Sequence, residues 1–188
     1  MKLDKKLEKM LNEHMNHERF NETFYLAGAA YLDFLELEGM SSYFKLHAAE
    51  EKTHFERFYD YIEENGGRCI ITGIEDPAKL GDFKSVQDVF EKAVAAEELT
   101  SKRIREINDY AHEINDFRAR TFLNTFELEQ QEEEDLWNYN LARAKIVKDD
   151  PAALLKFDCE MAMRRQCGVK KGTDKRDMFQ GNMTQKDD

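Results

Sequence analysis

The sequence predicts an all-α protein, built as an antiparallel bundle of four long helices with a short fifth helix after it. The 188 residues include only 9 Gly and 2 Pro, so long stretches lack the residues that end helices. Four segments repeat apolar side chains at the i, i+3, i+4, i+7 spacing of one helix face. A chain of this length can bury one sizeable core, so we expect one bundle domain over 1–167 and a polar tail over 168–188.

Helix-ending residues divide the first part of the chain into two long helices. The first helix is expected to run from Asp4, a candidate N-cap, to Glu38, where Gly39 would stop it. The second helix is expected to begin at residue 41 or 42 and to end at the sequence NGG, residues 65–67. The turn between them is short, so the two helices should form an antiparallel hairpin.

A connection of 17 residues, 68–84, separates this hairpin from a second one. It is too long for a tight turn and suits a crossing of the whole bundle. Ser85 is a candidate N-cap, with Asp88 three residues later as in a capping box. The third, fourth and fifth helices are expected over about 85–114, 116–148 and 151–167, the last opening on Pro151.

Composition and charge argue against several classes of partner. The net charge of -11 and the isoelectric point near 5.0 argue against nucleic acid, which selects clustered Lys and Arg. No apolar run approaches the ~20 residues of a membrane span, and MKLDKKLEKM lacks the apolar core of a signal peptide. Cys69, Cys159 and Cys167 lack zinc-site spacing. We therefore expect a cytoplasmic protein with reduced cysteines.

Carboxylates interrupt the apolar face of each long helix near its middle. They are Glu18, Glu51, Glu97 and, on the fourth helix, Glu129 and Glu133. A single acid of this kind normally lies at the edge of a core and reaches water. Several acids buried together without partners would each cost several kcal/mol, so the set indicates bound metal cations.

The polar positions recur at one spacing in both hairpins. Glu51 follows Glu18 by 33 residues, and Gln130 follows Glu97 by 33 residues. Two similar hairpins that face each other across an approximate twofold axis would produce this repetition. The sequence therefore predicts one shared site between the hairpins.

The second helix carries Glu51-x-x-His54, whose spacing places both side chains on one helix face. Glu51 could then bridge two metals while His54 binds one of them. Di-iron bundles carry a Glu on two helices and a Glu-x-x-His on the other two, whereas here the fourth helix has Gln130-x-x-Glu133. Oxygen ligands with one imidazole suit iron or manganese, and also zinc.

Over about residues 7–167 the chain resembles the non-haem ferritins, especially the bacterial type. Four segments carry the resemblance jointly: NHERFNETFY (16–25), HAAEEKTH (47–54), AAEELT (95–100) and ELEQQEEE (127–134). The resemblance implies the ferritin-like bundle with its long crossover loop and short fifth helix. It also implies a homo-oligomer, a hollow shell of 24 subunits.

The resemblance further implies which residues bind iron. Glu18, Glu51 and His54 would hold the first iron, and Glu51, Glu97 and Glu133 the second, with Gln130 nearby. A third iron would lie at Glu50, Glu129, Glu133 and Glu132. Tyr25 would be hydrogen-bonded at the centre and able to donate an electron. Taken alone, Tyr25 also fits core packing, and Glu50 and Glu132 also fit a solvated helix edge.

The function so implied is iron storage with ferroxidase activity, in which O2 oxidises Fe(II) and ferric oxyhydroxide accumulates in the shell. No haem is expected, because the fourth helix lacks a second Glu-x-x-His and Lys52 follows Glu51. One alternative is a di-iron or di-manganese oxidase of the same superfamily that oxidises an organic substrate or detoxifies peroxide without storing iron. Another is a structural bundle with an inactive site.

Three positions depart from the ferritin pattern. Arg120 and Leu123 stand where animal ferritins carry channel acids, and Thr125 stands where many bacterial ferritins carry tryptophan. The usual route for iron and the usual supply of electrons are therefore in doubt. His14 and His47 each lie one turn before a proposed ligand. They fit an indirect role at the metal site, a transient contact with iron, or ordinary hydrogen bonding in the bundle.

Overall fold

The structure is a computed structural model that describes residues 3–74, 82–148 and 150–166. In this part of the chain the secondary structure is entirely helical, as predicted. The helices are α1 (Lys5–Phe34), α2 (Glu38–Glu64), α4 (Val86–Glu113), α5 (Phe117–Val147) and α6 (Pro151–Gln166). None of the helices described has the length and apolar character needed to cross a membrane. Cys167 and the predicted tail lie outside the described residues.

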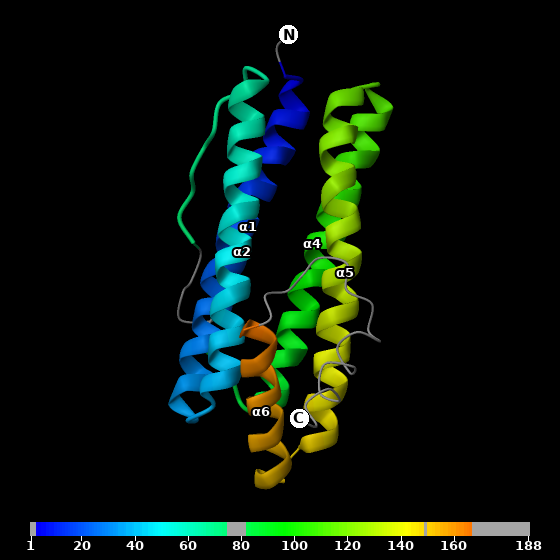
Figure 1. Ribbon diagram of the computed structural model, residues 1–188. Helices are drawn as coiled ribbons and strands as arrows, with labels where there is room; N and C mark the ends of the chain where they lie inside the picture. The colour runs from blue at the N-terminus through cyan, green and yellow to red at the C-terminus, as the bar shows by residue number, and fades with distance from the viewer. Residues whose placement is uncertain (1–2, 75–81, 149, 167–188) are drawn as a thin grey trace, which may run out of the picture.

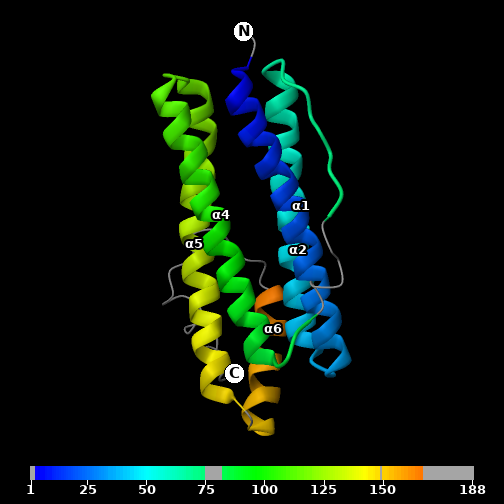
Figure 2. The same cartoon turned by 180° about the vertical axis from the view of Figure 1, so that it is seen from behind.

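Two antiparallel hairpins, α1–α2 and α4–α5, lie side by side, and α6 packs at one end of the bundle (Figures 1 and 2). The chain enters α4 at the end of the bundle where α1 finishes. The ring of Phe83, just before α4, lies 6.0 Å from the ring of Phe24 and 5.5 Å from the ring of Tyr31, both in the second half of α1. At the other end Tyr110 donates a hydrogen bond to Asp4 over 3.1 Å. The connection between α2 and α4 therefore spans the bundle, and the predicted crossover is confirmed.

The first part of this crossover is held against α1 by two asparagines one turn apart. Asn12 donates to the carbonyl of Arg68 over 3.0 Å and accepts from the amide of Ile70 over 2.7 Å. Asn16 donates to the carbonyl of Ile70 and accepts from the amide of Thr72, each over 2.8 Å. These four bonds satisfy backbone groups of an extended segment that has no strand partner.

The predicted boundary between the first two helices is wrong by several residues. The sequence predicts a helix to Glu38 with a stop at Gly39, whereas α1 ends at Phe34 and α2 begins at Glu38. The chain reverses at Glu36, which adopts a left-handed φ of 60°. A non-glycine residue therefore makes the turn that the sequence assigned to glycine.

Gly39 is needed for a different reason, namely the close approach of α6. A Cβ atom at Gly39 would lie 2.1 Å from the carbonyl oxygen of Asp158. The carboxylate of Asp158 accepts hydrogen bonds from the amides of Gly39, over 3.1 Å, and Met40, over 2.7 Å. A residue of α6 thus satisfies amides in the first turn of α2 that have no partner within the helix.

The predicted caps of the other helices are confirmed. Asp4 accepts hydrogen bonds from the amides of Lys6 and Leu7 over 2.9 and 3.0 Å. Ser85 accepts from the amide of Asp88 over 3.1 Å. Local capping chemistry therefore specifies where α1 and α4 begin.

Two hydrophobic clusters fill the bundle, one toward each end. The cluster next to α6 contains Tyr25, Phe44, Phe90 and Trp137, and the other contains residues such as Phe58. Buried polar side chains from α1, α2, α4 and α5 separate them. The polar level is therefore a gap in the apolar core, as the interrupted stripes predicted.

The buried face of α5 is displaced by one residue from the predicted one. The sequence predicted Glu129 and Glu133 on the buried face of this helix, but both are only half-buried. The buried positions of α5 are Ala119, Leu123, Phe126, Gln130, Trp137, Asn140, Leu141, Ala144 and Val147. The buried polar residue of α5 at the middle level is therefore the amide Gln130 and not a carboxylate. Leu123, at one of the two positions compared with channel acids, belongs to the core.

Candidate metal centre

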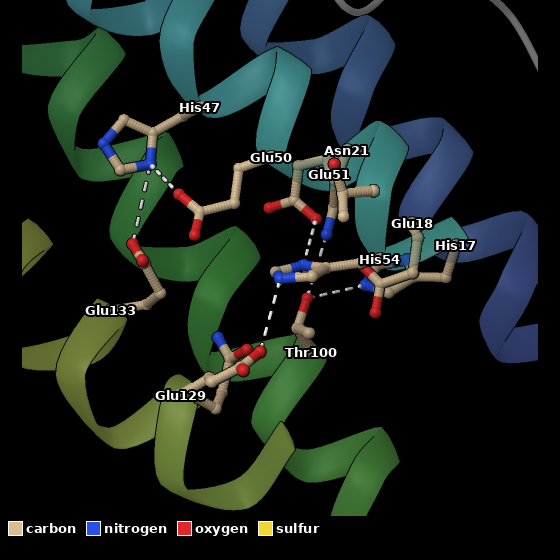
Figure 3. A network of polar contacts seen from close by, with 12 residues as sticks. His17, Glu18, Asn21, His47, Glu50, Glu51, His54, Thr100, Glu129 and Glu133 are labelled. Atoms are coloured by element: carbon tan, nitrogen blue, oxygen red, sulfur yellow. Dashed lines mark hydrogen bonds and ion pairs between the residues drawn. The ribbon is translucent and has the colours of Figure 1, made fainter. Parts of the chain in front are cut away.

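Four helices each place a polar side chain in the gap between the two apolar clusters. Glu18 from α1, Glu51 and His54 from α2, Glu97 from α4 and Gln130 from α5 are all at most 6% exposed. One ligand atom from each of Glu18, Glu51 and His54 lies within 4.8 Å of the others. Figure 3 shows these three side chains converging from α1 and α2. We call them the buried group.

Glu97 is fixed beside this group by hydrogen bonds from two residues. The hydroxyl of Tyr25 donates to one carboxylate oxygen of Glu97, and the side-chain amide of Gln130 donates to the other. Gln130 also donates to the backbone carbonyl of Glu97 over 3.2 Å. Each carboxylate oxygen has a second lone pair, so Glu97 can accept a cation without losing these partners.

Glu18 is the residue that most needs a cation. Its side chain is fully buried, and neither carboxylate oxygen receives a well-formed hydrogen bond from the residues described. Nε2 of His14 lies 2.7 Å from Oε1 of Glu18. Burial, with smaller effects from Arg103 and His54, lowers the pKa of His14 to about 3, so this contact joins a neutral ring to the carboxyl group and is not an ion pair.

The carboxyl groups of the centre resist ionisation when no metal is bound. Burial, followed by the charge of Glu18, raises the pKa of Glu51 to about 8. Burial and the charge of Glu51 raise the pKa of Glu97 to about 8. Burial also raises the pKa of Glu18. At neutral pH the centre therefore holds protons that an incoming cation would displace.

His54 is the cationic partner of these acids. Burial opposes its protonation, but the hydrogen bond from its ring to Glu51 and the charges of Glu51 and Glu18 outweigh that effect and raise its pKa to about 9. Nδ1 of His54 lies 3.3 Å from Oε2 of Glu51, and Nε2 lies 3.6 Å from Oε2 of Glu129. To bind a metal, His54 must first lose this proton.

A second group, His47, Glu50 and Glu133, joins α2 to α5 (Figure 3). Nδ1 of His47 lies 3.5 Å from Oε2 of Glu133 and 3.9 Å from Oε2 of Glu50. The side chains of Glu50 and Glu133 are 26% and 14% exposed, so we call this set the half-buried group. Burial, and secondarily His54, lower the pKa of His47 to about 3, so its ring is neutral and able to bind a metal.

His47 is the possible ligand that the sequence reasoning did not assign to a site. From the sequence, His47 fits an indirect role, a transient contact with iron or ordinary hydrogen bonding. Its spacing from Glu50 is three residues, the same spacing as in Glu51-x-x-His54 with the order reversed. That spacing was the available indication, since it places both side chains on one helix face.

Two acids proposed for the third iron lie apart from the half-buried group. Glu129 accepts a hydrogen bond of 2.6 Å from Arg57, which also donates to Thr125 over 2.9 Å and stacks 3.8 Å over the ring of Phe126. Glu132 is exposed. The structure thus brings Glu50 and Glu133 together with His47, while Glu129 is engaged by a cation. The four-acid site remains a prediction.

A buried polar cluster locks α1 to α4 beside the centre. Nε2 of His17 lies 3.1 Å from the hydroxyl of Thr100, and Asn21 donates to the same hydroxyl over 3.0 Å. Thr100 in turn donates to the carbonyl of Ala96 over 3.1 Å. Because Glu18 adjoins His17 in α1, this cluster fixes the height of Glu18 relative to Glu97.

Comparison with known proteins assigns this architecture to one family. A family model described as a ferritin-like domain matches residues 8–146. The bacterial non-heme ferritin of Staphylococcus saprophyticus is 34% identical over 162 residues, which cover 86% of this chain and 96% of that protein. The bacterial non-heme ferritin of Staphylococcus aureus strain USA300 is 32% identical with the same coverage.

Solved structures agree with these sequence matches. The open pore ferritin of the hyperthermophilic archaeon Archaeoglobus fulgidus superposes with a TM-score of 0.84 at 29% identity, over 87% of this chain and 99% of that one. A closed form of the same ferritin, engineered by site-directed mutagenesis, superposes with a TM-score of 0.82 at 30% identity, over 86% of this chain and 98% of that one.

Proposed function

This chain belongs to the ferritin family, and we propose that it is an iron-storage ferritin with ferroxidase activity. Fe(II) is its substrate and iron its cargo. O2 oxidises Fe(II) to Fe(III) at the buried centre, and the product is stored as ferric oxyhydroxide inside a hollow homo-oligomeric shell. The 24-subunit count, the cytoplasmic location and the lack of haem are parts of this proposal that stay predictions.

The observation that carries the proposal is the state of Glu18. Its two carboxylate oxygens are buried without well-formed hydrogen bonds, next to Glu51 and His54. A buried carboxyl group whose hydrogen bonds are incompletely formed costs about 1–3 kcal/mol or more, and apolar packing at this position would avoid that cost. A divalent cation would satisfy Glu18 and bring Glu51 and His54 into one coordination shell. Carboxylate oxygens with one imidazole are suitable ligands for iron.

The residues divide the work between two Fe(II) ions. Glu18, Glu51 and His54 would hold the first, and Glu51 and Glu97 the second, with Glu133 approaching from α5. Gln130 and Tyr25 would keep the Glu97 carboxylate oriented through their hydrogen bonds. The hydrogen-bonded pair of Glu51 and His54 would release the proton it holds as the ions bind, because burial raises the pKa of Glu51 and the acids around His54 raise the pKa of its ring.

The same carboxylates favour oxidation of the bound ions. The attraction between anionic ligands and a metal ion grows with the charge of the metal, and it is strong in a buried, poorly screened site. Fe(III) is therefore stabilised more than Fe(II) by Glu18, Glu51 and Glu97. This difference lowers the cost of transferring electrons to O2, which is the reaction that we propose.

The test is anaerobic addition of Fe(II) to metal-free protein, followed by O2 and by measurement of ferric-oxo absorbance. We expect a fast phase that saturates at two to three Fe per subunit, followed by uptake far beyond that ratio. Glu18→Gln should remove the fast phase. Glu56→Gln, at an exposed position of α2 that pairs with Lys52, is the matched control and should leave it intact.

Three results would contradict the proposal. Uptake that stops after the fast phase would favour a non-storing oxidase of the same superfamily. A fast phase that is missing in the unmodified protein, or unchanged in Glu18→Gln, would mean that the buried acids do not form a ferroxidase centre.

A further inference from the structure

Trp137 is the only tryptophan of the chain, and it lies fully buried on α5, four residues after Glu133, in the apolar cluster next to α6. Its ring stacks on Tyr25 with a centroid distance of 5.2 Å and an interplanar angle of 24°. Tyr25 in turn donates its hydroxyl hydrogen bond to Glu97. Trp137 is therefore connected to Glu97, a ligand of the proposed iron centre, by one ring contact and one hydrogen bond through Tyr25.

On its other side Trp137 contacts the half-buried group. The ring of His47 lies 4.8 Å from the ring of Trp137, and His47 shares its group with Glu50 and Glu133. The rings of Tyr25 and His47 are 5.8 Å apart. The three rings thus form a continuous aromatic contact from one metal group to the other.

The polar atom of Trp137 makes this position unusual for simple packing. Its Nε1 is buried and has no hydrogen-bond acceptor among the residues described. A buried N–H without an acceptor costs about 1–3 kcal/mol, and phenylalanine at this position would avoid that cost. An indole differs from a phenyl ring chiefly in being far easier to oxidise, which points to an electronic role.

We propose that Trp137 is an electron-transfer residue that carries electrons from Fe(II) at His47, Glu50 and Glu133 to Tyr25 at the buried centre. The proposal rests on the proposed ferroxidase function and extends it. It assigns the half-buried group a purpose, which is to hold the Fe(II) that restores Tyr25 after each oxidation.

The electrons and protons balance in three steps. Reduction of O2 to two water molecules takes four electrons and four protons. The two buried Fe(II) ions supply two of the electrons, and Tyr25 supplies the other two in two successive oxidations, while the protons come from the ligand side chains and water. In each oxidation Tyr25 passes its phenolic proton to Glu97 and becomes a neutral radical. Trp137 then gives one electron to Tyr25, which takes its proton back from Glu97. Fe(II) in the half-buried group reduces the Trp137 radical cation and becomes Fe(III).

The missing acceptor at Nε1 determines how long the tryptophan radical lasts. Without a base beside it, oxidised Trp137 keeps its proton and stays a cation in an apolar cluster that includes Phe44 and Phe90. Such a cation is unfavourable, so it is reduced rapidly. Trp137 is therefore a relay, and Tyr25 is the site where the radical accumulates.

The experiment is rapid freeze-quench electron paramagnetic resonance on the full-length protein, mixed with three Fe(II) per subunit and then with O2. We expect a tyrosine radical whose lifetime increases several-fold in Trp137→Phe. We also expect a short-lived tryptophan radical signal in the protein without substitutions. Its hyperfine splitting should be narrower when the protein is labelled with ring-deuterated tryptophan than when it is unlabelled. Because the chain has one tryptophan, this narrowing would identify Trp137 without any substitution.

Two variants separate electron transfer from packing. Phe90→Leu removes a ring 6.0 Å from Trp137 and should lower thermal stability without changing the radical lifetime. Glu50→Gln weakens the Fe(II) donor site and should prolong the tyrosine radical as Trp137→Phe does.

A tyrosine radical with the same lifetime in Trp137→Phe and unmodified protein, and no effect of indole deuteration, would overturn the relay while leaving ferroxidase function in place. The absence of any protein radical during fast Fe(II) oxidation would do the same. Failure of Fe(II) oxidation itself would instead reject the proposed function on which the relay depends.

A measurement without turnover gives an independent check. Trp137 is the only indole fluorophore, and Co(II) bound at His47 would quench it at short range. Anaerobic titration of metal-free protein should quench the emission strongly, and Glu50→Gln should move this quenching to higher Co(II) concentration. Equal quenching curves for the two proteins would contradict electronic contact between this group and Trp137.

Discussion

The buried group and the half-buried group use the same kinds of side chain in different surroundings. Glu18 is 0% exposed and lacks well-formed hydrogen bonds, whereas the side chains of Glu50 and Glu133 are 26% and 14% exposed. A buried carboxylate is costly without a cation and gains most from binding one. Glu50 can reach water, whereas Oε2 of Glu133 is buried without a hydrogen bond from the residues described. The difference suggests tight binding and oxidation in the first group and easier exchange in the second.

The two histidines show the same contrast in their protonation. Burial opposes the protonation of His54, but its acidic neighbours raise its pKa to about 9. Burial instead dominates at His47 and lowers its pKa to about 3. Metal binding at the buried group must therefore displace a proton from imidazole, whereas His47 is already neutral. At the half-buried group the proton to be displaced is on Glu133 instead, because burial and the charge of Glu50 raise the pKa of that carboxyl group well above its ordinary value.

The largest expected effect comes from removing the bridging acid of the buried group. Glu51→Gln keeps the size of the side chain but removes its charge. Changing a residue that only hydrogen-bonds to a metal ligand costs up to about 100-fold in activity. Because Glu51 would bind the metals directly, the rate of fast Fe(II) oxidation should fall by at least that factor. Stopped-flow absorbance after O2 addition measures the rate of this oxidation. Glu56→Gln is the control, and a fast phase retained in Glu51→Gln would remove the distinction between the two groups.

The metal-free protein should lose stability as pH rises from about 6.5 to about 8. In this range Glu51, Glu97 and His54 hold protons in the folded state, with pKa values of about 8, 8 and 9. In the unfolded chain the pKa values are near 4.5 for glutamate and 6.5 for histidine, so the unfolded chain holds fewer protons. The free energy of unfolding therefore decreases as pH rises. Three buried histidines have lowered pKa values, so they change the free energy of unfolding only at pH values below this range. They are His14, His17 and His47.

Urea unfolding at several pH values measures this dependence. The combined variant Glu51→Gln, Glu97→Gln should flatten it, because neutral amides have no proton to lose. Zn(II), an inert substitute for Fe(II), should raise stability and release protons at pH 7. A free energy of unfolding that stays constant or rises across the range would contradict the assigned protonation states.

A smaller effect, on the affinity for the third iron, should distinguish the half-buried group from the four-acid site that the resemblance predicted. Glu50→Gln should weaken binding of the third iron by about 10- to 100-fold, since it removes an anionic ligand. The first two ions should bind as before. Glu132→Gln changes an exposed acid on α5 and should have little effect. Anaerobic Fe(II) titration by calorimetry decides, and equal losses in both variants would favour the four-acid site.

The smallest effect concerns Arg57, which holds Glu129 away from that group. Arg57→Gln removes the ion pair and the contact with Phe126, so a metal no longer competes with this guanidinium for Glu129. We expect a several-fold tighter third iron site in the same titration. Thr125→Val, which removes only one hydrogen bond of Arg57, is the matched control. Weaker binding in Arg57→Gln would show that the arginine supports the site.

Much of the fold follows from local features of the sequence. The caps at Asp4 and Ser85 lie where the side chains predicted them, because capping depends on a few neighbouring atoms. The stripes of the first three helices are buried as expected, since their 3.6-residue period is unambiguous. On α5 the polar run EQQEEE allows more than one face, and only packing selects Gln130 over its acidic neighbours.

The sequence by itself determined the helices, the long crossover and the level at which acids interrupt the core. Tertiary structure alone decided where glycine was needed, because Gly39 meets the backbone of Asp158 from α6 rather than making the turn. It alone brought His47 to Glu133 and stacked Trp137 on Tyr25. Periodicity specifies which face of a helix is buried, but the partner across the bundle depends on the rotation and height of every helix.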